Sequence, residues 1–337
     1  MISTLQMWLE NPSKTRSAGR SLAHTVYHVP VTICLTGDLG AGKTTFLQGL
    51  AEELGIAEHV SSPTYALEQR YITRTGRAFL HLDLYRLSPS DAAAIVDGTD
   101  DEDAIRCIEW ADKLPDTYCF DRSIRLHFEE SGDGRALTVN YDDMPLPDLA
   151  VIETWRRDAR LPAHIIRHCD AVADVAAVLA DRLTARGDMV RKDALIAAAR
   201  VHDLFRFIDF RGAGPPGVTE TEDERQAWDS WKKRFADMRH EAACATFLQE
   251  KGFPEIATIV STHGLMLPQQ EFMTIEQKLL FYADKRVAND RITSISERFT
   301  DFSRRYSHNQ LTDKHLLWFE QTQKLEKELF PEGAPVL

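Results

Sequence analysis

A glycine-rich segment near the N-terminus constrains the fold of this chain more than any other feature. Residues 37–44 read Gly-Asp-Leu-Gly-Ala-Gly-Lys-Thr and satisfy every fixed position of the pattern G-x-x-x-x-G-K-[ST]. A strand-like apolar run at residues 31–35 precedes the segment, and residues 45–54 after it suit a helix. A strand, a glycine-rich turn and a helix in this order predict a phosphate-binding loop in an α/β sheet.

Each part of this loop has a chemical role in nucleotide binding. Backbone N–H groups close around phosphate oxygens, and the helix N-terminus adds a favourable partial charge. Lys43 would contact the β- and γ-phosphates, and the Thr44 hydroxyl would ligate Mg²⁺. The residues of this segment that we expect to bind nucleotide are Gly37, Asp38, Gly40, Ala41, Gly42, Lys43, Thr44 and Thr45.

A carboxylate at the end of a neighbouring buried strand should complete the magnesium site. The apolar run at residues 79–82 ends in Asp83, which makes Asp83 the candidate. The alternative, an ordinary aspartate at a strand end, stays open at this point.

The rest of the first half indicates a mostly parallel sheet with flanking helices, because short apolar runs alternate with helical segments. The strand candidates are residues 79–84, 106–108, 124–128 and 136–140, of which the last two form a possible hairpin. An acidic stretch with two prolines, residues 141–148, reads as a linker. The predicted division is a domain at 1–141, a linker at 142–160 and a second domain at 161–337.

The second half shows long amphipathic helices and few strand-like runs, which predicts an all-α domain. Residues 211–217, Arg-Gly-Ala-Gly-Pro-Pro-Gly, read as a flexible insertion within it. Potential metal ligands follow one another along this half: His168, His202, Asp203, His240, His263 and Asp284.

The adjacent pair His202-Asp203 is the most informative part of this set. It ends a helical run at residues 195–201, where two neighbouring side chains can both reach one metal ion. His168 lies on an apolar helix face, and Asp284 follows a strongly apolar run, so both should point inward. A buried aspartate needs a cation or hydrogen-bond donors, and imidazole with carboxylate suits Fe, Mn, Co, Ni or Zn.

Single members of the set are ambiguous. Taken alone, His240 or His263 is more often a surface or core residue than a metal ligand. His164, four residues before His168 on the same helix, is either no ligand or a substrate contact. The order of the whole set favours a metal site.

Charge and composition exclude several classes of function. The net charge is −12, and residues 1–150 hold 13 Lys and Arg against 23 Asp and Glu. Direct, stable nucleic-acid binding by the first domain is therefore not expected. No apolar run reaches the ~20 residues of a membrane span, which predicts no membrane partner. Scattered cysteines and the lack of a signal-peptide pattern predict a cytoplasmic protein.

Ordered motifs over residues 1–140 add a specific resemblance. They are residues 36–46 around the glycine-rich loop, Ser62-Pro63-Thr64-Tyr65, residues 81–87 (His-Leu-Asp-Leu-Tyr-Arg-Leu) and Ile108-Glu109-Trp110, with a matching opening helix from Thr15. This half resembles the TsaE (YjeE) family, a small bacterial ATPase needed to make threonylcarbamoyladenosine at position 37 of tRNAs.

The resemblance implies further roles. Thr64 would be a switch-loop residue near the γ-phosphate and Mg²⁺, and Glu109 would orient water or ligate Mg²⁺ through water. Trp110 would pack near the nucleotide, and Thr15 joins the nucleotide-binding residues. The implied catalytic residues are Lys43, Asp83 and Glu109, and the implied magnesium ligands are Thr44, Asp83 and Glu109.

The resemblance also implies partners. The family uses ATP with Mg²⁺, binds the TsaD–TsaB pair, and resets that complex by ATP turnover. One departure is the stretch at residues 92–103, which is acidic and lacks the usual apolar-glycine segment before Ile-Glu-Trp.

The order H…HD…H…H…D resembles the HD superfamily of metal-dependent phosphohydrolases over about residues 160–310. The added His240 and His263 are what two-metal members carry, with Asp203 bridging the ions as a catalytic residue. The resemblance therefore implies two transition-metal ions in an HD domain. A metal pair generates hydroxide at neutral pH and stabilises charge on a phosphoryl group.

The sequence thus predicts a TsaE-type ATPase fused to a two-metal HD phosphohydrolase that acts on nucleotides, with modified nucleoside monophosphates among the candidates. Two alternatives stay open. The HD domain could bind a nucleotide without hydrolysing it and regulate the ATPase. The first half could instead be a nucleoside kinase with the second half as its opposing phosphatase.

Overall fold

The computed structural model describes residues 3–99, 103–210, 221–264, 274–306 and 313–337. It divides into two compact units: unit 1 is Met1–Pro145 with Arg182–Arg191, and unit 2 is Leu146–Asp181 with Lys192–Leu337. The predicted insertion at 211–217 and part of the acidic stretch at 92–103 lie outside the described residues. Among the helices described, none is long and apolar enough to cross a membrane.

Unit 1 contains a seven-stranded sheet in the order β1-β7-β6-β2-β5-β4-β3. The central strands β6 (Ser123–Ser131), β2 (Val31–Gly37), β5 (Ala104–Glu109) and β4 (Ala78–Asp83) run parallel to one another. The other three strands pair antiparallel with their neighbours: β1 (Ser3–Leu9) and β3 (Glu68–Ile72) at the two edges, and β7 (Gly134–Asp142) between β1 and β6. The predicted strands and hairpin are confirmed. β1 was not predicted, although Leu5, Met7 and Leu9 alternate with exposed residues as in a half-buried strand.

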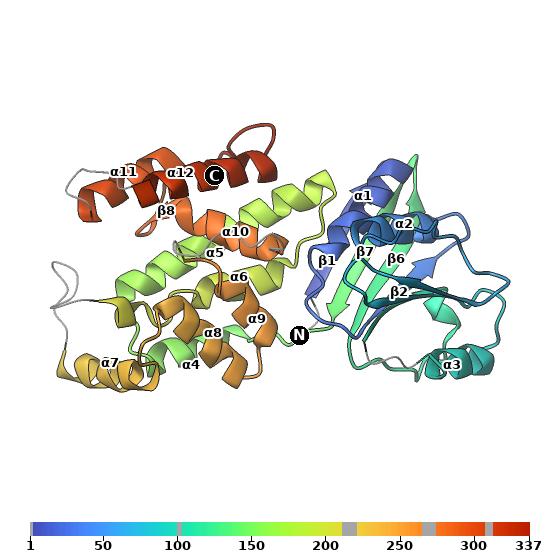
Figure 1. Ribbon diagram of the computed structural model, residues 1–337, viewed down its shortest axis with the longest axis horizontal. Helices are drawn as coiled ribbons and strands as arrows, with labels where there is room; N and C mark the ends of the chain where they lie inside the picture. Colours follow the sequence, from blue (N-terminus) through green and yellow to red (C-terminus); the bar gives the residue numbers. More distant parts are fainter. Residues whose placement is uncertain (1–2, 100–102, 211–220, 265–273, 307–312) are drawn as a thin grey trace. The chain divides into compact units, whose positions relative to one another are not determined.

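Two helices cover one face of this sheet side by side, α1 (Pro12–Ala23) and α2 (Lys43–Glu53) (Figure 1). Glycines allow their backbones to touch, since a Cβ on Gly19 would lie 2.0 Å from the carbonyl oxygen of Phe46. Phe46 itself is fully buried and belongs to one apolar core with Ile33 and Leu35 of β2. This packing fixes α2 directly behind the strand that it follows, and so fixes the loop between them. The short helix α3 (Pro89–Asp97) packs on β4 and β5 through a smaller core.

A buried ion pair ties the segment Arg182–Arg191 to the rest of unit 1. Arg191 is 1% exposed, and its Nη2 lies 2.8 Å from Asp143 Oδ2 while its Nη1 bonds to Oδ1. Its guanidinium also lies 4.2 Å from the ring centre of Tyr141. Asp143 and helix α4 (Leu149–Asp158) both fall within residues 142–160, the stretch predicted to be a linker.

Arg191→Met should destabilise unit 1, because it leaves the Asp143 carboxylate buried without its cation. Breaking one side of a buried ion pair costs about 3–5 kcal/mol. Hydrogen exchange at the strands of unit 1 under mild denaturant measures the loss. The matched control is Arg77→Met, since Arg77 pairs with Asp103 at the surface of the same unit and its loss should cost at most about 1 kcal/mol. Equal, small losses in both variants would contradict the expectation.

Within its described residues, unit 2 contains helices and a hairpin of two-residue strands, β8 (Val287–Ala288) and β9 (Arg291–Ile292). The all-α expectation therefore holds with this small exception. The remaining helices are α5 (Ala163–Arg186), α6 (Lys192–Val201), α7 (Glu222–Arg234), α8 (His240–Glu250), α9 (Pro254–Val260), α10 (Ile275–Lys285), α11 (Ile295–Tyr306) and α12 (Asp313–Leu329). Cys169, Val172 and Leu179 form the buried stripe of α5, as the helical spacing predicts. That stripe faces the core and carries His168 inward with it.

Candidate functional site

The predicted phosphate loop lies between the last residue of β2 and the first residue of α2. Its glycines have left-handed backbone angles, with φ of 127° at Gly37, 85° at Gly40 and 108° at Gly42. Ala41 is buried between them, and Thr44 and Thr45 belong to the first turn of α2. Because glycine adopts positive φ at little cost, the loop can turn its N–H groups inward as a phosphate cradle requires.

Lys43 is folded back onto the loop. Its Nζ donates to the carbonyl oxygens of Gly37 and Asp38 at 2.6 and 2.8 Å, and it lies 3.8 Å from the ring centre of Trp110. Burial lowers the pKa of Lys43, while the nearby Glu109 carboxylate opposes that change. A desolvated ammonium held only by carbonyl oxygens is well suited to an anionic phosphate.

Glu109 and Asp83 end adjacent parallel strands and are register partners. Thr44 Oγ1 donates to Glu109 Oε1 at 2.7 Å, so the hydroxyl and the carboxylate predicted to handle Mg²⁺ meet directly. His81 Nε2 lies 2.9 Å from the same Glu109 oxygen. His81 is fully buried. It lies in the motif at residues 81–87, but the sequence predicts no role for it.

The switch-loop residue Thr64 lies against Asp83. Its Oγ1 donates to Asp83 Oδ2 at 2.7 Å, and the Ser62 hydroxyl donates to the same oxygen. Asp83 is 2% exposed and accepts both hydroxyls, so the carboxylate expected to hold Mg²⁺ lies directly beside the expected switch loop. A magnesium site at Asp83 stays a prediction.

Arg135 is a candidate that the sequence did not single out. It lies on β7, and its Nη1 donates to Thr15 Oγ1 at 3.2 Å. The same nitrogen would lie 3.0 Å from a Cβ placed on Gly42. The Arg135 guanidinium therefore reaches the phosphate loop, although Arg135 lies far from that loop in the sequence. Its place there depends on the pairing of β7 with β1, where Leu9 lies opposite Arg135, and with β6, where Glu130 does. No local motif marks it.

In unit 2 the predicted metal ligands come together. They are supplied by α5 (His168), the turn after α6 (His202 and Asp203), the start of α8 (His240), the turn after α9 (His263) and the end of α10 (Asp284). Their ligand atoms form two groups, each within 4.8 Å: His168, His202 and Asp284 in the first group, and Asp203, His240 and His263 in the second. His164 is in neither group.

Asp203 faces both groups, one with each of its oxygens. Oδ1 lies 3.0 Å from His240 Nε2 and 3.6 Å from His263 Nε2. Oδ2 lies 3.8 Å from His202 Nε2 and 4.0 Å from His168 Nε2. This is the geometry that a carboxylate bridging two cations would have.

Hydrogen bonds at Nδ1 orient the histidines. The Nδ1 atoms of His168, His202 and His263 lie 2.7, 2.7 and 2.6 Å from the carbonyl oxygens of Asn289, Ala199 and Val260. A proton on Nδ1 leaves the Nε2 lone pair free for a metal. His202 Nε2 is buried and has no hydrogen-bond partner in the described structure, which fits a cation at this position.

The electrostatics of the cluster also suit a metal. Burial lowers the pKa of His202 to about 4, so its imidazole is neutral at physiological pH. Burial by itself raises the pKa of Asp203, but His202 and Arg206 outweigh it and hold that pKa well below the usual range. Lys285 does the same for Asp284, against the effect of burial. The neutral His202 imidazole and the ionised carboxylates are forms that bind transition metals, whereas neighbouring carboxylates raise the pKa of His168 and of His240 against the effect of burial.

A cavity of about 270 Å³ opens onto this cluster. Besides the ligands, its wall carries four positively charged side chains, two carboxylates and one aromatic ring: Arg206, Arg239, Lys285, Arg298, Asp209, Glu241 and Trp318. Lys285 Nζ is held by Asp284 Oδ2 and by the carbonyl oxygen of His263. The cavity thus joins a candidate metal centre to a wall suited to phosphate oxygens.

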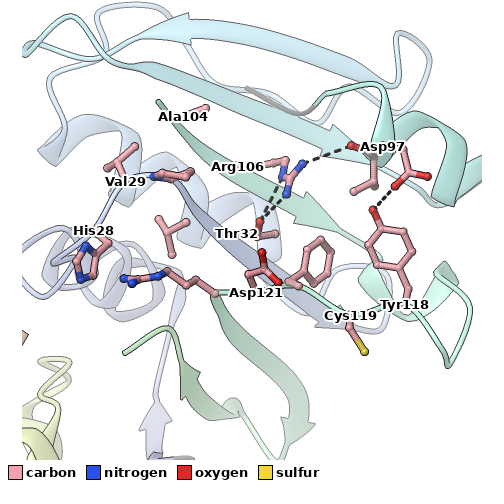
Figure 2. Close-up of a pocket in the computed structure, with 14 residues that line it drawn as sticks. His28, Val29, Thr32, Asp97, Ala104, Arg106, Tyr118, Cys119 and Asp121 are labelled. Carbon is pink, nitrogen blue, oxygen red and sulfur yellow. Dashed lines mark hydrogen bonds between the residues drawn. The ribbon is translucent and has the colours of Figure 1, made fainter. Parts of the chain in front are cut away.

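A larger cavity of about 670 Å³ lies in unit 1, at the other end of β2 from the phosphate loop. Thr32 near the start of β2 lines it, and Figure 2 shows Arg106 bonded to Thr32 and Tyr118 bonded to Asp97. Its wall mixes arginine and aspartate, and no sequence motif falls within it. We assign no function to it.

A phosphate loop with two nearby carboxylates is typical of P-loop nucleotide hydrolases, and the His and Asp cluster of unit 2 could hold metal ions as in metal-dependent hydrolases. The family described as "Threonylcarbamoyl adenosine biosynthesis protein TsaE" matches residues 9–137, and "HD domain" matches residues 165–289. The chain belongs to the TsaE family and carries an HD domain after its ATPase domain.

Two relatives agree with the TsaE assignment of the first part of the chain. The tRNA threonylcarbamoyladenosine biosynthesis protein TsaE of a Nostoc species is 37% identical over 115 residues, 33% of this chain and 70% of that protein. The TsaE protein of Borreliella burgdorferi is 38% identical over 119 residues, 34% of this chain and 85% of that protein. A solved structure described as a predicted HD superfamily hydrolase involved in NAD metabolism, from Clostridium acetobutylicum, is 16% identical with a TM-score of 0.31, covering 57% of this chain and 93% of that one.

Proposed function

We propose that unit 2 hydrolyses phosphate esters of nucleotides at two bound metal ions. The observation that carries this proposal is Asp203, whose two oxygens each face a separate group of ligand atoms. His168, His202 and Asp284 would hold one ion, and His240 and His263 the other. Two ions at this cluster would supply hydroxide at neutral pH and neutralise charge on the phosphoryl group.

The cavity wall supports a nucleotide as substrate. Arg206 and Lys285 lie beside the ligands and offer N–H donors to phosphate oxygens. Trp318 offers an aromatic face on which a base can stack. Nucleoside monophosphates, modified ones included, would present one phosphate to the cationic side chains and one base to Trp318.

A hydrolysis screen tests this proposal. The Lys43→Ala variant, which removes the contribution of unit 1, is incubated with Mn²⁺ or Co²⁺ and nucleoside mono-, di- and triphosphates, with ribose 5-phosphate as the control lacking a base. We expect phosphate release from a nucleotide at least about tenfold faster than from the sugar phosphate, since base stacking is worth about 1–3 kcal/mol. Nucleotide binding without turnover under any metal would instead support the regulatory alternative.

For unit 1 we propose the ATP-hydrolysing mechanism of a TsaE-type site. When nucleotide binds, the Lys43 ammonium would leave the carbonyl oxygens of Gly37 and Asp38 and contact the β- and γ-phosphates. Thr44 and Asp83 would hold Mg²⁺. Glu109 would accept a hydrogen bond from the attacking water in place of the Thr44 hydroxyl. This exchange is supported by the positions of all these groups at the ends of β2, β4 and β5.

Two further groups would adjust to the nucleotide. Thr64, which donates a hydrogen bond to Asp83, would contact the γ-phosphate and so couple the loop around Thr64 to the bound nucleotide. Arg135 would add positive charge beside the phosphate loop at Gly42, with Thr15 orienting its guanidinium.

Unit 1 would serve the TsaD–TsaB pair, as its family does. Leu39 in the phosphate loop is 74% exposed and Tyr65, next to Thr64, is 86% exposed. Arg86 lies 4.5 Å from the ring centre of Tyr65. Exposed apolar side chains on the two loops that would contact nucleotide support a partner surface at this position.

Glu109→Gln should reduce turnover far more than nucleotide binding. A carboxylate that orients water acts mainly in the transition state, so kcat should fall about 10²–10³-fold while the ATP dissociation constant stays within a few-fold. Single-turnover kinetics and equilibrium nucleotide binding measure the two quantities separately. Equal losses in both would make Glu109 a direct metal ligand or a structural residue instead.

A further inference from the structure

One of the histidines in the metal cluster is held differently from the others. His168, His202 and His263 direct Nδ1 at main-chain carbonyl oxygens. His240 Nδ1 instead lies 2.7 Å from Asp209 Oδ2 and 3.2 Å from Glu241 Oε2. Its orientation therefore depends on two side-chain carboxylates and not on the backbone.

These carboxylates are themselves fixed by arginines. Arg239 Nη2 lies 3.1 Å from Asp209 Oδ2, and Arg239 Nε lies 3.5 Å from Glu241 Oε2. Arg206 Nη1 lies 3.8 Å from Asp209 Oδ2 and 3.1 Å from His240 Nε2. Asp209 and Glu241 thus contact the His240 imidazole on one side and are held by the guanidinium groups of Arg206 and Arg239 on the other.

The same residues could in principle form a metal site of their own. The ligand atoms of Asp209, His240 and Glu241 lie within 4.8 Å of one another. Arg239 contacts both carboxylates, so a cation placed among them would compete with its guanidinium for the same oxygens at short range. The contacts therefore favour an orienting role over metal binding.

We infer that Asp209, supported by Glu241, is a positioning residue that points His240 at Asp203 and makes the two metal positions unequal. The inference rests on the proposed two-metal function. A carboxylate on the second nitrogen of a metal-binding histidine fixes its tautomer and ring orientation, and its loss lowers metal affinity by about 10–100-fold. The position at His240 and His263 should weaken by this amount without Asp209. The position at His168, His202 and Asp284 should not, because main-chain carbonyls orient its histidines.

Metal titration of the full chain tests the inference. Metal-free wild type, Asp209→Ala, Asp209→Asn and Asp181→Ala are each titrated with Co²⁺, and the sites are counted by calorimetry and by the absorption of bound Co²⁺. Asp181→Ala is the matched control, because Asp181 pairs with Lys192 at the surface of the same unit. Asp209→Ala should keep one site and weaken the other about 10–100-fold. Asp209→Asn, which keeps a hydrogen-bond acceptor, should weaken it less.

Each other outcome has a distinct meaning. Two unchanged sites in Asp209→Ala overturn the inference and leave the two-metal function standing. Wild type that binds no metal overturns the proposed function itself. Loss of both sites, with a lower unfolding temperature of the metal-free variant, overturns the inference in favour of a structural role. A third Co²⁺ per wild-type chain that is lost in Asp209→Ala overturns it in favour of a metal site at Asp209.

Discussion

Asp203→Ala should release both metal ions of unit 2 and abolish its phosphohydrolase activity. The two Asp203 oxygens face different groups of histidines, at 3.0 Å from His240 Nε2 and at 3.8 Å from His202 Nε2. Removing a carboxylate shared by both ions takes one ligand from each and leaves two like charges without the anion between them. Elemental analysis should show about two metals per chain in wild type purified without chelator, falling toward zero in the variant.

Other variants separate this effect from general damage. His263→Ala should weaken mainly one metal position, since His263 approaches a single Asp203 oxygen. ATP hydrolysis by unit 1 should survive in Asp203→Ala, which shows that the chain is folded. Wild type that arrives metal-free and cannot be reconstituted with Mn²⁺, Fe²⁺, Co²⁺, Ni²⁺ or Zn²⁺ would contradict the hydrolase assignment.

Lys43→Ala should lower ATP hydrolysis by about 10²–10³-fold, since a charge-assisted contact to a transferring phosphate is worth that much in rate. The Lys43 ammonium is desolvated and donates to the carbonyl oxygens of Gly37 and Asp38, which are neutral acceptors that an anionic phosphate can displace. The measurement uses an Asp203→Ala background, in which phosphate released by unit 2 does not contribute.

The control for this variant is Arg77→Ala. Arg77 pairs with Asp103 at the surface, at the other end of β4 from Asp83, so its loss removes a cation without touching the loop. ATPase activity of Lys43→Ala equal to that of Arg77→Ala would mean that the hydrolysis occurs elsewhere in the chain.

The phosphate loop could be predicted because its chemistry needs consecutive residues. The turn, its lysine and its hydroxyl must follow one another for the backbone to surround a phosphate, so the sequence of residues 37–44 carries the whole motif. The candidate metal ligands of unit 2 could be selected from the sequence for a related reason. Each lies at a helix end or on an inward helix face, and the adjacent His202-Asp203 marks where they meet.

The residues that act through other residues could not be predicted. Arg135 reaches Gly42 and Thr15 only through strand pairing, which no local pattern encodes. Asp209 contacts His240 from the short 3₁₀ helix Arg206–Asp209, and an aspartate there has no characteristic spacing from its partner. Groups that orient ligands need only proximity in three dimensions, so their positions along the chain are unconstrained.

The segment Arg182–Arg191 has a consequence for how such a fusion can be inherited. It belongs to the same compact unit as Met1–Pro145, although the intervening residues belong to the other unit. A gene cut after residue 145 would encode an ATPase with the Asp143 carboxylate buried and Arg191 missing. A single breakpoint that exchanges unit 2 as one block would therefore also remove the buried partner of Asp143 from unit 1.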